Sequence, residues 1–236
     1  MYIPSHFAPD AADVEALLVN HGAADLVTVT DQGLVATLLP FVYVPPSAQQ
    51  RAAGELGPTG KHGPTGKHGP TGKHGSLHGH LARNNPQWSL PAAGEALAIV
   101  RGPDAYVSPG WYASKAEHGR VVPTWNYVTA HVYGRFTVHD DPGWTEDLVR
   151  RLTTKHEAFR EQPWSVDDAP RAYVEGQLRA IVGVELEITR IEAKAKMSQN
   201  RSAADVAGVI AGLCERGDVE AADAMEQANK ARLAAG

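Results

Sequence analysis

The distribution of apolar and polar positions along the first part of the chain predicts a helix followed by a β-hairpin. Residues 10–22 place apolar side chains every three or four positions after Asp10, a good helix N-cap, which predicts a helix. Residues 26–30 and 34–44 are rich in β-branched and apolar residues on either side of a short polar turn, which predicts paired strands. Pro40 lies inside the second strand, where it favours an edge position or a bulge.

The middle of the chain continues with strand patterns. Residues 97–100 and 105–108 are predicted as strands around a Gly-Pro-Asp turn at 102–104, and residues 125–138 as one long strand. Apolar and polar residues alternate over 184–188, which indicates a half-buried strand.

Helical patterns dominate the second half. Asp141 is predicted to cap a helix with Pro142 at its first position, and another helix is predicted over 168–181. Two terminal helices are predicted over 202–213 and 218–233. About six mostly antiparallel strands with helices late in the chain predict an α+β fold, an antiparallel barrel or sheet. The sequence lacks the glycine-rich signatures of dinucleotide-binding and P-loop folds.

Residues 57–74 are three identical copies of Gly-Pro-Thr-Gly-Lys-His. Glycine falls at every third position, but the run is too short and too poor in proline to hold a collagen triple helix. The histidines of the repeat, His62, His68 and His74, could bind a metal ion. The segment has no hydrophobic anchor, so we predict a flexible loop over 57–75.

Composition and charge narrow the class of protein. The chain has 236 residues, enough for a large core, and no apolar run long enough to cross a membrane. Its N-terminus lacks the features of a signal peptide, which predicts a cytoplasmic protein. The single cysteine, Cys214, rules out an internal disulfide and is predicted to be packed in a helix. A net charge of −5 argues against non-specific binding to DNA.

Residues 77–88 form the densest polar cluster, which we expect to follow the loop and to begin a short helix. Arg83 offers a fork of donors suited to a phosphate or a carboxylate, and His80 with Asn84 or Asn85 could add further donors. His78 and His80 could instead bind a metal ion, and simple structural hydrogen bonding remains a further alternative.

Two later clusters could also contact a ligand. In residues 121–131, Trp125 and Tyr127 offer flat faces for an aromatic cofactor, while neighbouring Thr and Asn side chains offer polar contacts. The same strand could equally be packed in a core or in a dimer interface. Residues 194–201 combine two lysines and an arginine with Ser, Gln and Asn. They could hold an anionic ligand or cap the helix that starts at Ser202.

Several of these segments together resemble the PaiB-like family of FMN-binding negative transcriptional regulators. The resemblance rests on stretches that run in family order over nearly the whole chain: residues 1–4, 78–86, 102–109, 122–127, His156-Glu157, Pro163-Trp164 and 196–201. The triple repeat is the main departure from the family pattern. The family is similar to split-barrel flavoproteins related to pyridoxamine-phosphate oxidases.

The resemblance implies a fold, a cofactor and a set of contacts. The fold is an antiparallel split β-barrel with peripheral helices and a helical C-terminus, and a homodimer binds FMN at the subunit interface. The strand 35–39 would lie beneath the flavin, and His80, Arg83 and Asn84 would hold the phosphate. The full set of expected cofactor-binding residues is Thr37, Leu38, His78, His80, Arg83, Asn84, Asn126, Thr129, Lys196, Ser198, Gln199 and Asn200.

The resemblance also implies a domain division, with an FMN-binding domain over 1–192 and a C-terminal motif and helical tail over 193–236. A regulator with FMN is the first functional hypothesis. A flavin-dependent oxidoreductase on the same fold is the second, and a haem-binding relative with His78 or His80 as ligand is the third. Direct DNA binding is possible but is not supported by the charge, and the residues do not decide whether the protein is an enzyme.

Overall fold

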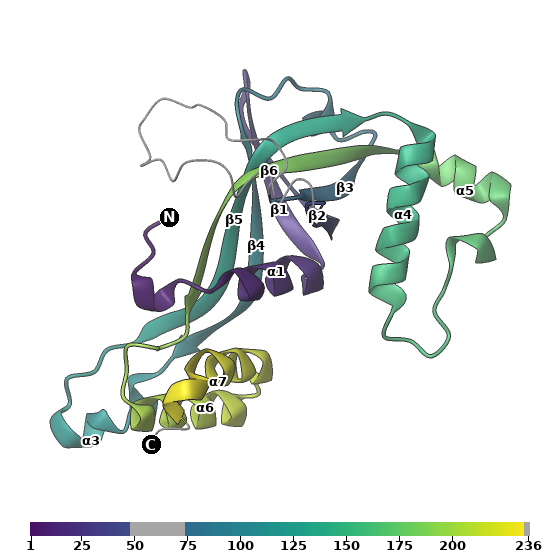
Figure 1. Cartoon of the computed structure of the whole chain (residues 1–236). Helices are drawn as coiled ribbons and strands as arrows, with labels where there is room; N and C mark the ends of the chain where they lie inside the picture. Colours follow the sequence, from purple (N-terminus) through teal and green to yellow (C-terminus); the bar gives the residue numbers. More distant parts are fainter. Residues whose placement is uncertain (48–73, 234–236) are drawn as a thin grey trace. The chain divides into compact units, whose positions relative to one another are not determined.

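The computed structural model describes residues 1–47 and 74–233, so most of the repeat lies outside the described residues. Six strands close into an antiparallel barrel in the order β1-β2-β3-β6-β5-β4, and the chain ends in two helices, which confirms the predicted α+β barrel with a helical C-terminus (Figure 1). The strands are β1 (Ala23–Thr30), β2 (Gly33–Val44), β3 (Ser76–Ala82), β4 (Ala96–Val107), β5 (Thr124–His139) and β6 (Ile181–Lys196).

The helices of the described residues are α1 (Ala11–Asn20), α3 (Ser114–His118), α4 (Pro142–Glu157), α5 (Arg171–Leu178), α6 (Ala203–Arg216) and α7 (Val219–Leu233). Four short 3₁₀ helices complete them: η1 (Ser5–Phe7), η2 (Pro86–Trp88), η3 (Pro109–Trp111) and η4 (Val166–Asp168). Within 1–47 and 74–233, none of these helices is long and apolar enough to cross a membrane.

The chain divides into two compact units. The barrel unit consists of Leu18–Val100 and His131–Ile191, and the tail unit of Met1–Leu17, Arg101–Ala130 and Glu192–Gly236. The tail unit thus combines residues from the start, the middle and the end of the chain.

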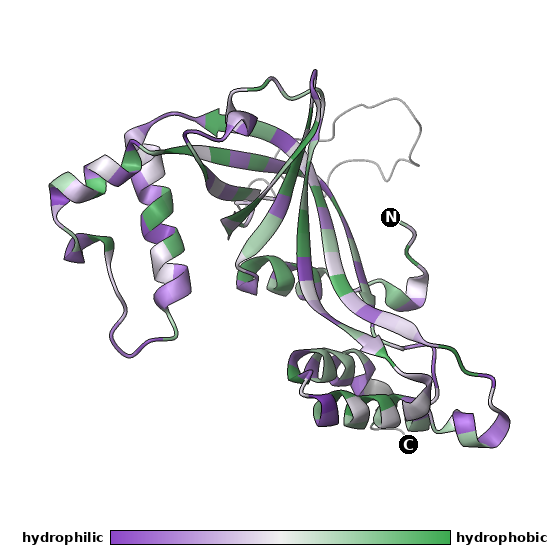
Figure 2. Cartoon of the chain, turned by 180° about the vertical axis from the view of Figure 1, so that it is seen from behind, coloured by the Kyte–Doolittle hydropathy of each residue, from purple (hydrophilic) through white to green (hydrophobic). Residues whose placement is uncertain are grey.

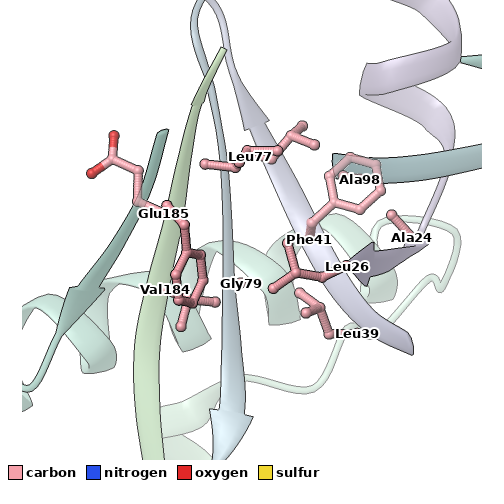
Figure 3. Close-up of a pocket in the computed structure, with 11 residues that line it drawn as sticks. Ala24, Leu26, Leu39, Phe41, Leu77, Gly79, Ala98, Val184 and Glu185 are labelled. Atoms are coloured by element: carbon pink, nitrogen blue, oxygen red, sulfur yellow. The ribbon is translucent and has the colours of Figure 1, made fainter. Parts of the chain in front are cut away.

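Antiparallel pairing builds the barrel unit. Strand β1 pairs along its whole length with β2 and over three residues with β4, while β3 pairs with the end of β2 and with β6. Inward-facing apolar side chains fill the interior and leave a cavity of about 20 Å³ (Figure 3). That volume is about the room that one water molecule occupies. Helix α4 packs against β2 and β3 through its apolar stripe, in which Leu148 and Leu152 are buried (Figure 2).

The β1–β2 hairpin also has an apolar outer face. The register places Val29 opposite Leu34, Val27 opposite Ala36, and Asp25 opposite Leu38, so these six side chains share one face. Leu34 is 75% exposed and Leu38 is 68% exposed. We call this surface, formed by Val27, Val29, Leu34, Ala36 and Leu38, the hairpin face.

The tail unit has a separate hydrophobic core, formed by residues of β4, the C-terminal end of β6, α6 and α7. Helices α6 and α7 lie side by side (Figure 1). Trp111 packs directly on α6 at Gly208 and Gly212, because a Cβ atom at Gly212 would lie 2.4 Å from the Trp111 ring. Gly212 therefore provides space for the Trp111 indole, and Gly208 provides space for the Trp111 backbone carbonyl.

The predicted helix ends agree with the structure. Asp10 Oδ1 accepts a hydrogen bond from the Asp13 amide at 2.8 Å, and Asp141 Oδ1 accepts one from the Trp144 amide at 2.6 Å. Pro142 occupies the first turn of α4, and Gly217, with φ of 89°, separates α6 from α7. Strands β1, β2 and β5 also lie where the pattern predicted them.

Two predictions about the elements were wrong. The segment 102–104 is part of the continuous strand β4, not a turn, and residues 77–82 belong to strand β3, not to a helix. The helix predicted over 168–181 is present as α5 but is shorter, because Asp168 ends η4 and Ile181 begins β6. Cys214, predicted to be packed, is exposed because it lies on the outer side of α6.

Candidate functional site

The twelve residues expected to bind the cofactor are divided equally between the two units. Those in the barrel unit are Thr37, Leu38, His78, His80, Arg83 and Asn84; those in the tail unit are Asn126, Thr129, Lys196, Ser198, Gln199 and Asn200.

Arg83 follows β3 and already has a carboxylate partner. Its Nη2 and Nη1 atoms donate to Asp140 at 2.6 and 3.2 Å, and its Nε donates to the Arg179 carbonyl at 2.8 Å. The hydrogen bond from Arg83 lowers the pKa of Asp140, and the same contact raises the pKa of Arg83. Both side chains are largely exposed, so this ion pair is in contact with water and can exchange partners.

Arg83 lines a groove with a volume of about 600 Å³ in the barrel unit. We call it the Arg83 groove. Its walls come from the start of α4, from α5 and from the first residue of β6, and its lining residues are Arg83, Asp140, Asp141, Pro142, Gly143, Thr145, Glu146, Arg171, Glu175, Leu178, Arg179 and Ile181. The volume lies within the range of about 300–1,000 Å³ that is usual for small-molecule sites.

The segment after Arg83 is hydrogen-bonded to β1 and β2. Asn85 Nδ2 donates to Thr37 Oγ1 at 2.9 Å, and the buried Gln87 Nε2 donates to the Leu26 and Val35 carbonyls at 3.1 and 3.2 Å. These bonds bring Thr37, on the predicted flavin strand, to the polar segment that contains Arg83 and Asn84. Asn84 itself is exposed.

His78 and His80 both lie on β3, where their side chains point to the same side of the strand. His78 contacts Ser76, Glu185 and Arg151. His80 is half-buried, and its Nδ1 atom is buried without a hydrogen-bond partner in the part of the chain that the structure describes. Burial lowers the pKa of His80 below the ordinary imidazole value, which favours the neutral ring.

In the tail unit, Asn126 and Ser198 bond to each other. Asn126 Nδ2 donates to Ser198 Oγ at 3.1 Å, and Ser198 Oγ donates to Asn126 Oδ1 at 3.2 Å. Asn126 is 0% exposed and Ser198 is 4% exposed. A ligand could reach these two polar groups only if they separated.

Two further tail residues also have local partners. The Lys196 Nζ atom donates to Thr124 Oγ1 and to the Trp125 carbonyl, and burial lowers the pKa of Lys196. Gln199 Nε2 donates to the Ala195 carbonyl at 2.7 Å, closing the turn that leads to α6. Of the other two residues, Thr129 is half-buried in β5 and Asn200 is exposed.

Sequence reasoning missed the acidic partners of these cations and imidazoles. Asp140 contacts Arg83 from 57 positions away in the chain, and Glu185 contacts both His78 and His139. In the sequence, Asp140-Asp141-Pro142 is recognisable only as the start of a helix. Glu185 is recognisable only as a polar residue of an alternating strand. Within the described residues, no group of three His, Cys, Asp or Glu side chains has the geometry to hold a metal ion.

Comparison with known proteins then decides the family. The model of a family described as "Putative FMN-binding domain" matches residues 1–190. The chain belongs to this family. Its membership confirms the PaiB-like resemblance of the motifs and supports flavin binding.

Relatives at the sequence level agree with this result. The chain is 32% identical over 212 residues to "Protease synthase and sporulation protein PAI 2" of Bacillus subtilis (strain 168), a match that covers 89% of this chain and 87% of that protein. It is 35% identical over 164 residues to an uncharacterized protein of Emericella nidulans, covering 58% of this chain and 65% of that protein.

Solved structures give more distant likenesses. The flavocytochrome Anf3 of Azotobacter vinelandii has a TM-score of 0.49 and 12% identity, covering 79% of this chain and 67% of its own. An FAD- and haem-binding protein of Mycobacterium smegmatis has a TM-score of 0.48 and 16% identity, covering 81% and 74%. Because both TM-scores are low, neither likeness supports a conclusion about this chain.

Proposed function

We propose that this protein is a homodimeric FMN-binding protein with the regulatory role of the PaiB-like family, and that the FMN phosphate binds in the Arg83 groove. The observation that carries the proposal is the family match over residues 1–190, together with a groove of suitable volume beside Arg83. FMN supplies reversible two-electron and one-electron redox chemistry when it is bound.

The barrel interior and the Arg83 groove differ in whether they could accept a flavin. The barrel interior has about 20 Å³ of free volume and is lined almost wholly by apolar side chains, so neither the ring system nor the phosphate fits there. The Arg83 groove has about 600 Å³ and is lined by polar and charged residues as well as by apolar ones. Size and chemistry both favour the groove for the phosphate.

Arg83 is suited to a phosphate only if its present partner is replaced. Two of its nitrogen atoms donate hydrogen bonds to the Asp140 carboxylate. The guanidinium also donates to the backbone carbonyls of Arg179 and Ile181. A phosphate dianion carries more charge than a carboxylate and can accept the same fork of donors. Because the Arg83–Asp140 pair is exposed, we infer that phosphate displaces Asp140.

The hairpin face supports the homodimer. Its five apolar side chains lie on neighbouring strands of the barrel, with Asp25 as the one charged residue among them. A soluble monomer rarely leaves such a contiguous apolar surface open. We infer that a second copy of the chain covers it, because a two-fold axis lets identical apolar faces pack on each other.

The phosphate assignment is tested by comparing two ligands on two variants. Arg83→Ala should weaken FMN by about one to two decades in Kd and leave riboflavin, which has no phosphate, nearly unchanged. Asp140→Asn removes the competing charge but keeps the side-chain shape, so it should strengthen FMN and leave riboflavin unchanged. Fluorescence titration of the purified apoprotein measures all four affinities.

The pattern of results separates binding from general damage. If Arg83→Ala weakened both ligands equally, Arg83 would be a structural residue. If Asp140→Asn left FMN binding unchanged, the phosphate would not compete with Asp140. An absorption spectrum of the purified protein first establishes that the bound chromophore is a flavin rather than a haem.

The regulatory role rests on the family resemblance and needs its own test. The net charge of −5 gives no general attraction to DNA, so a specific site would have to supply the affinity. Salt-dependent binding to DNA upstream of genes that the protein controls would support a repressor. If the FMN-bound protein oxidised NAD(P)H at an appreciable rate and bound no DNA, the function would be that of an oxidoreductase and not of a regulator.

A further inference from the structure

A cluster of titratable side chains joins α4 to the outer surface of the barrel. Arg151 Nη2 on α4 lies 3.1 Å from His78 Nδ1 on β3. On the other side of the same ring, His78 Nε2 lies 2.7 Å from Ser76 Oγ and 3.3 Å from Glu185 Oε1. Glu185 Oε2 lies 2.8 Å from His139 Nε2 at the end of β5. Figure 3 shows the Glu185 carboxylate pointing away from the apolar residues of the barrel interior.

An indole ring completes the contact between α4 and the strands. Trp144, in the first turn of α4, stacks on the His139 ring at 4.1 Å with an angle of 11° between the planes. The same indole covers Gly183 of β6, where a Cβ atom would lie 2.3 Å from the ring. Helix α4 is therefore fixed at its first turn by stacking and about two turns later by the Arg151 contact.

The geometry determines the protonation state of His78. An arginine side chain only donates hydrogen bonds, so Nδ1 must accept from Arg151 and the single ring proton must be on Nε2. From Nε2 that proton is directed toward Ser76 and Glu185. A second proton on Nδ1 would place two N–H groups and two positive charges against each other.

We propose that His78, Arg151, Glu185 and His139 form a pH-operated clasp, which holds α4 against the barrel while His78 is neutral and releases it when His78 takes up a second proton. The charged groups facing His78 come from three elements: Arg151 from α4, Glu185 from β6 and His139 from β5. Arg151 is in turn held by Asp147, at 2.9 Å on the same helix.

The charges around His78 act in opposite directions. Burial disfavours the charged ring, Glu185 favours it, and Arg151 disfavours it; together they lower the pKa of His78 below its ordinary value. Burial also acts to raise the pKa of Glu185, but the hydrogen bonds from His139 and Ser76, together with the charges of His78 and His139, outweigh it and lower that pKa. Glu185 therefore stays charged throughout the range in which His78 titrates.

The sign of the pH effect follows from these states. The closed clasp binds fewer protons than the open one below the ordinary imidazole pKa of about 6.5. Its stability is complete above that pH and is lost as the pH falls toward the lowered pKa of His78. Helix α4 forms one wall of the Arg83 groove, so opening of the clasp also reshapes that groove.

Amide hydrogen exchange of the full chain without ligand tests the clasp. Protection of the α4 amides, corrected for the intrinsic pH dependence of exchange, should be constant above about pH 6.5 and fall below it, by at most about tenfold per pH unit for one proton. The α6 amides, in the tail unit, serve as the internal reference and should not change. NMR titration of the His78 ring should show a midpoint below 6.5, at the lower end of the pH range over which protection is lost.

Two variants separate the roles of the histidines. In His78→Asn the amide oxygen can accept from Arg151 as Nδ1 does, but it does not titrate, so the pH response of α4 should disappear. His139→Gln keeps a donor toward Glu185, and its α4 response should persist. Each of three results would overturn the proposal. The protection of α4 in the natural protein could be independent of pH, the pH response could persist in His78→Asn, or the titration midpoint of His78 could lie at or above the ordinary value. The test involves no flavin, so its result is independent of the proposed function.

Discussion

At the scale of single residues, most of the polar side chains selected from the sequence have partners within their own unit. Asn126 bonds with Ser198, Lys196 with Thr124, and Arg83 with Asp140. The sequence singled out these residues as polar groups that could contact a ligand. It could not supply their partners, because Asp140 is 57 positions from Arg83 and Ser198 is 72 positions from Asn126. Only strand pairing and turn geometry bring such positions together.

Asn126 provides a test of whether a buried pair serves stability or cofactor binding. Asn126→Ala removes both hydrogen bonds and takes the Asn126 partner away from the buried Ser198 hydroxyl. The free energy of unfolding should therefore fall by about 1–3 kcal/mol. Asn200→Ala, at an exposed position of the same motif, should change stability by no more than about 0.5 kcal/mol. Urea denaturation measures both. A loss of FMN affinity in Asn126→Ala at unchanged stability would identify Asn126 as a ligand residue instead.

Two glycines of the barrel unit should respond to alanine in opposite directions. At Gly183 a Cβ would lie 2.3 Å from the Trp144 ring, so Gly183→Ala should destabilise the protein by about 1–3 kcal/mol. At Gly176, inside α5, the nearest atom would be 3.9 Å away, so Gly176→Ala should stabilise the helix by about 0.5–1 kcal/mol. Equal effects of the two changes on the denaturation midpoint would contradict the close packing of Trp144 on β6.

At the scale of elements, local signals predicted helix starts well and strand continuity poorly. Asp141 and Pro142 marked the start of α4 because capping depends on atoms within one turn. Gly102-Pro103-Asp104 carried an equally strong turn signal, yet β4 continues through it. A Cβ at Gly102 would lie 2.9 Å from Val128, so the glycine is needed for close approach to a neighbouring side chain rather than for a turn.

The cap of α4 can be tested directly. Asp141→Ala removes the acceptor for the Trp144 amide and should destabilise the protein by about 1 kcal/mol. Asp141→Ser keeps a capping oxygen and should recover most of that loss. Thermal denaturation of the two variants compares them. If Ser gave no recovery over Ala, the contribution of Asp141 would come from its charge in the Arg83 groove and not from the cap.

At the scale of the whole molecule, the chain is organised in two units that do not follow its linear order. The tail unit combines the N-terminal residues, the middle of the chain and the C-terminal helices, while the barrel unit takes the segments between them. The order of elements predicted an α+β barrel or sheet, and the family resemblance a split barrel with a helical tail. The sharing of β4, β5 and β6 between the units was not visible in the sequence, because the units are defined by contacts between residues far apart in the chain.

The repeat at 57–74 should be dispensable for folding. Removing it shortens the connection between β2 and β3, and loop closure entropy changes only slowly with length. His74 accepts a hydrogen bond from the Tyr43 hydroxyl through its backbone carbonyl, and Leu56, which would then precede Gly75, also has a carbonyl. The deletion variant should keep its melting temperature within a few degrees and its flavin affinity unchanged. Unfolding of the variant would show that the repeat has a structural role.

The predicted homodimer concerns the whole molecule, and the hairpin face is the surface at which it can be tested. Light scattering at micromolar concentration should give twice the mass of the 25.2 kDa chain. Leu34→Lys places a charge in the proposed interface opposite Val29, where burying it without a partner is costly, so the variant should dissociate. Phe159→Lys, at an apolar position that is 83% exposed in the connection from α4 to α5, is the matched control and should remain a dimer.

The long β5 strand from Trp125 to Val138 is the alternative surface, tested by Trp125→Lys. A natural protein that is monomeric would refute the dimer. A dimer that is disrupted by Trp125→Lys but not by Leu34→Lys would move the interface to β5. Because the charge is introduced at an already exposed side chain, the folded monomer should persist in each variant, and circular dichroism verifies this.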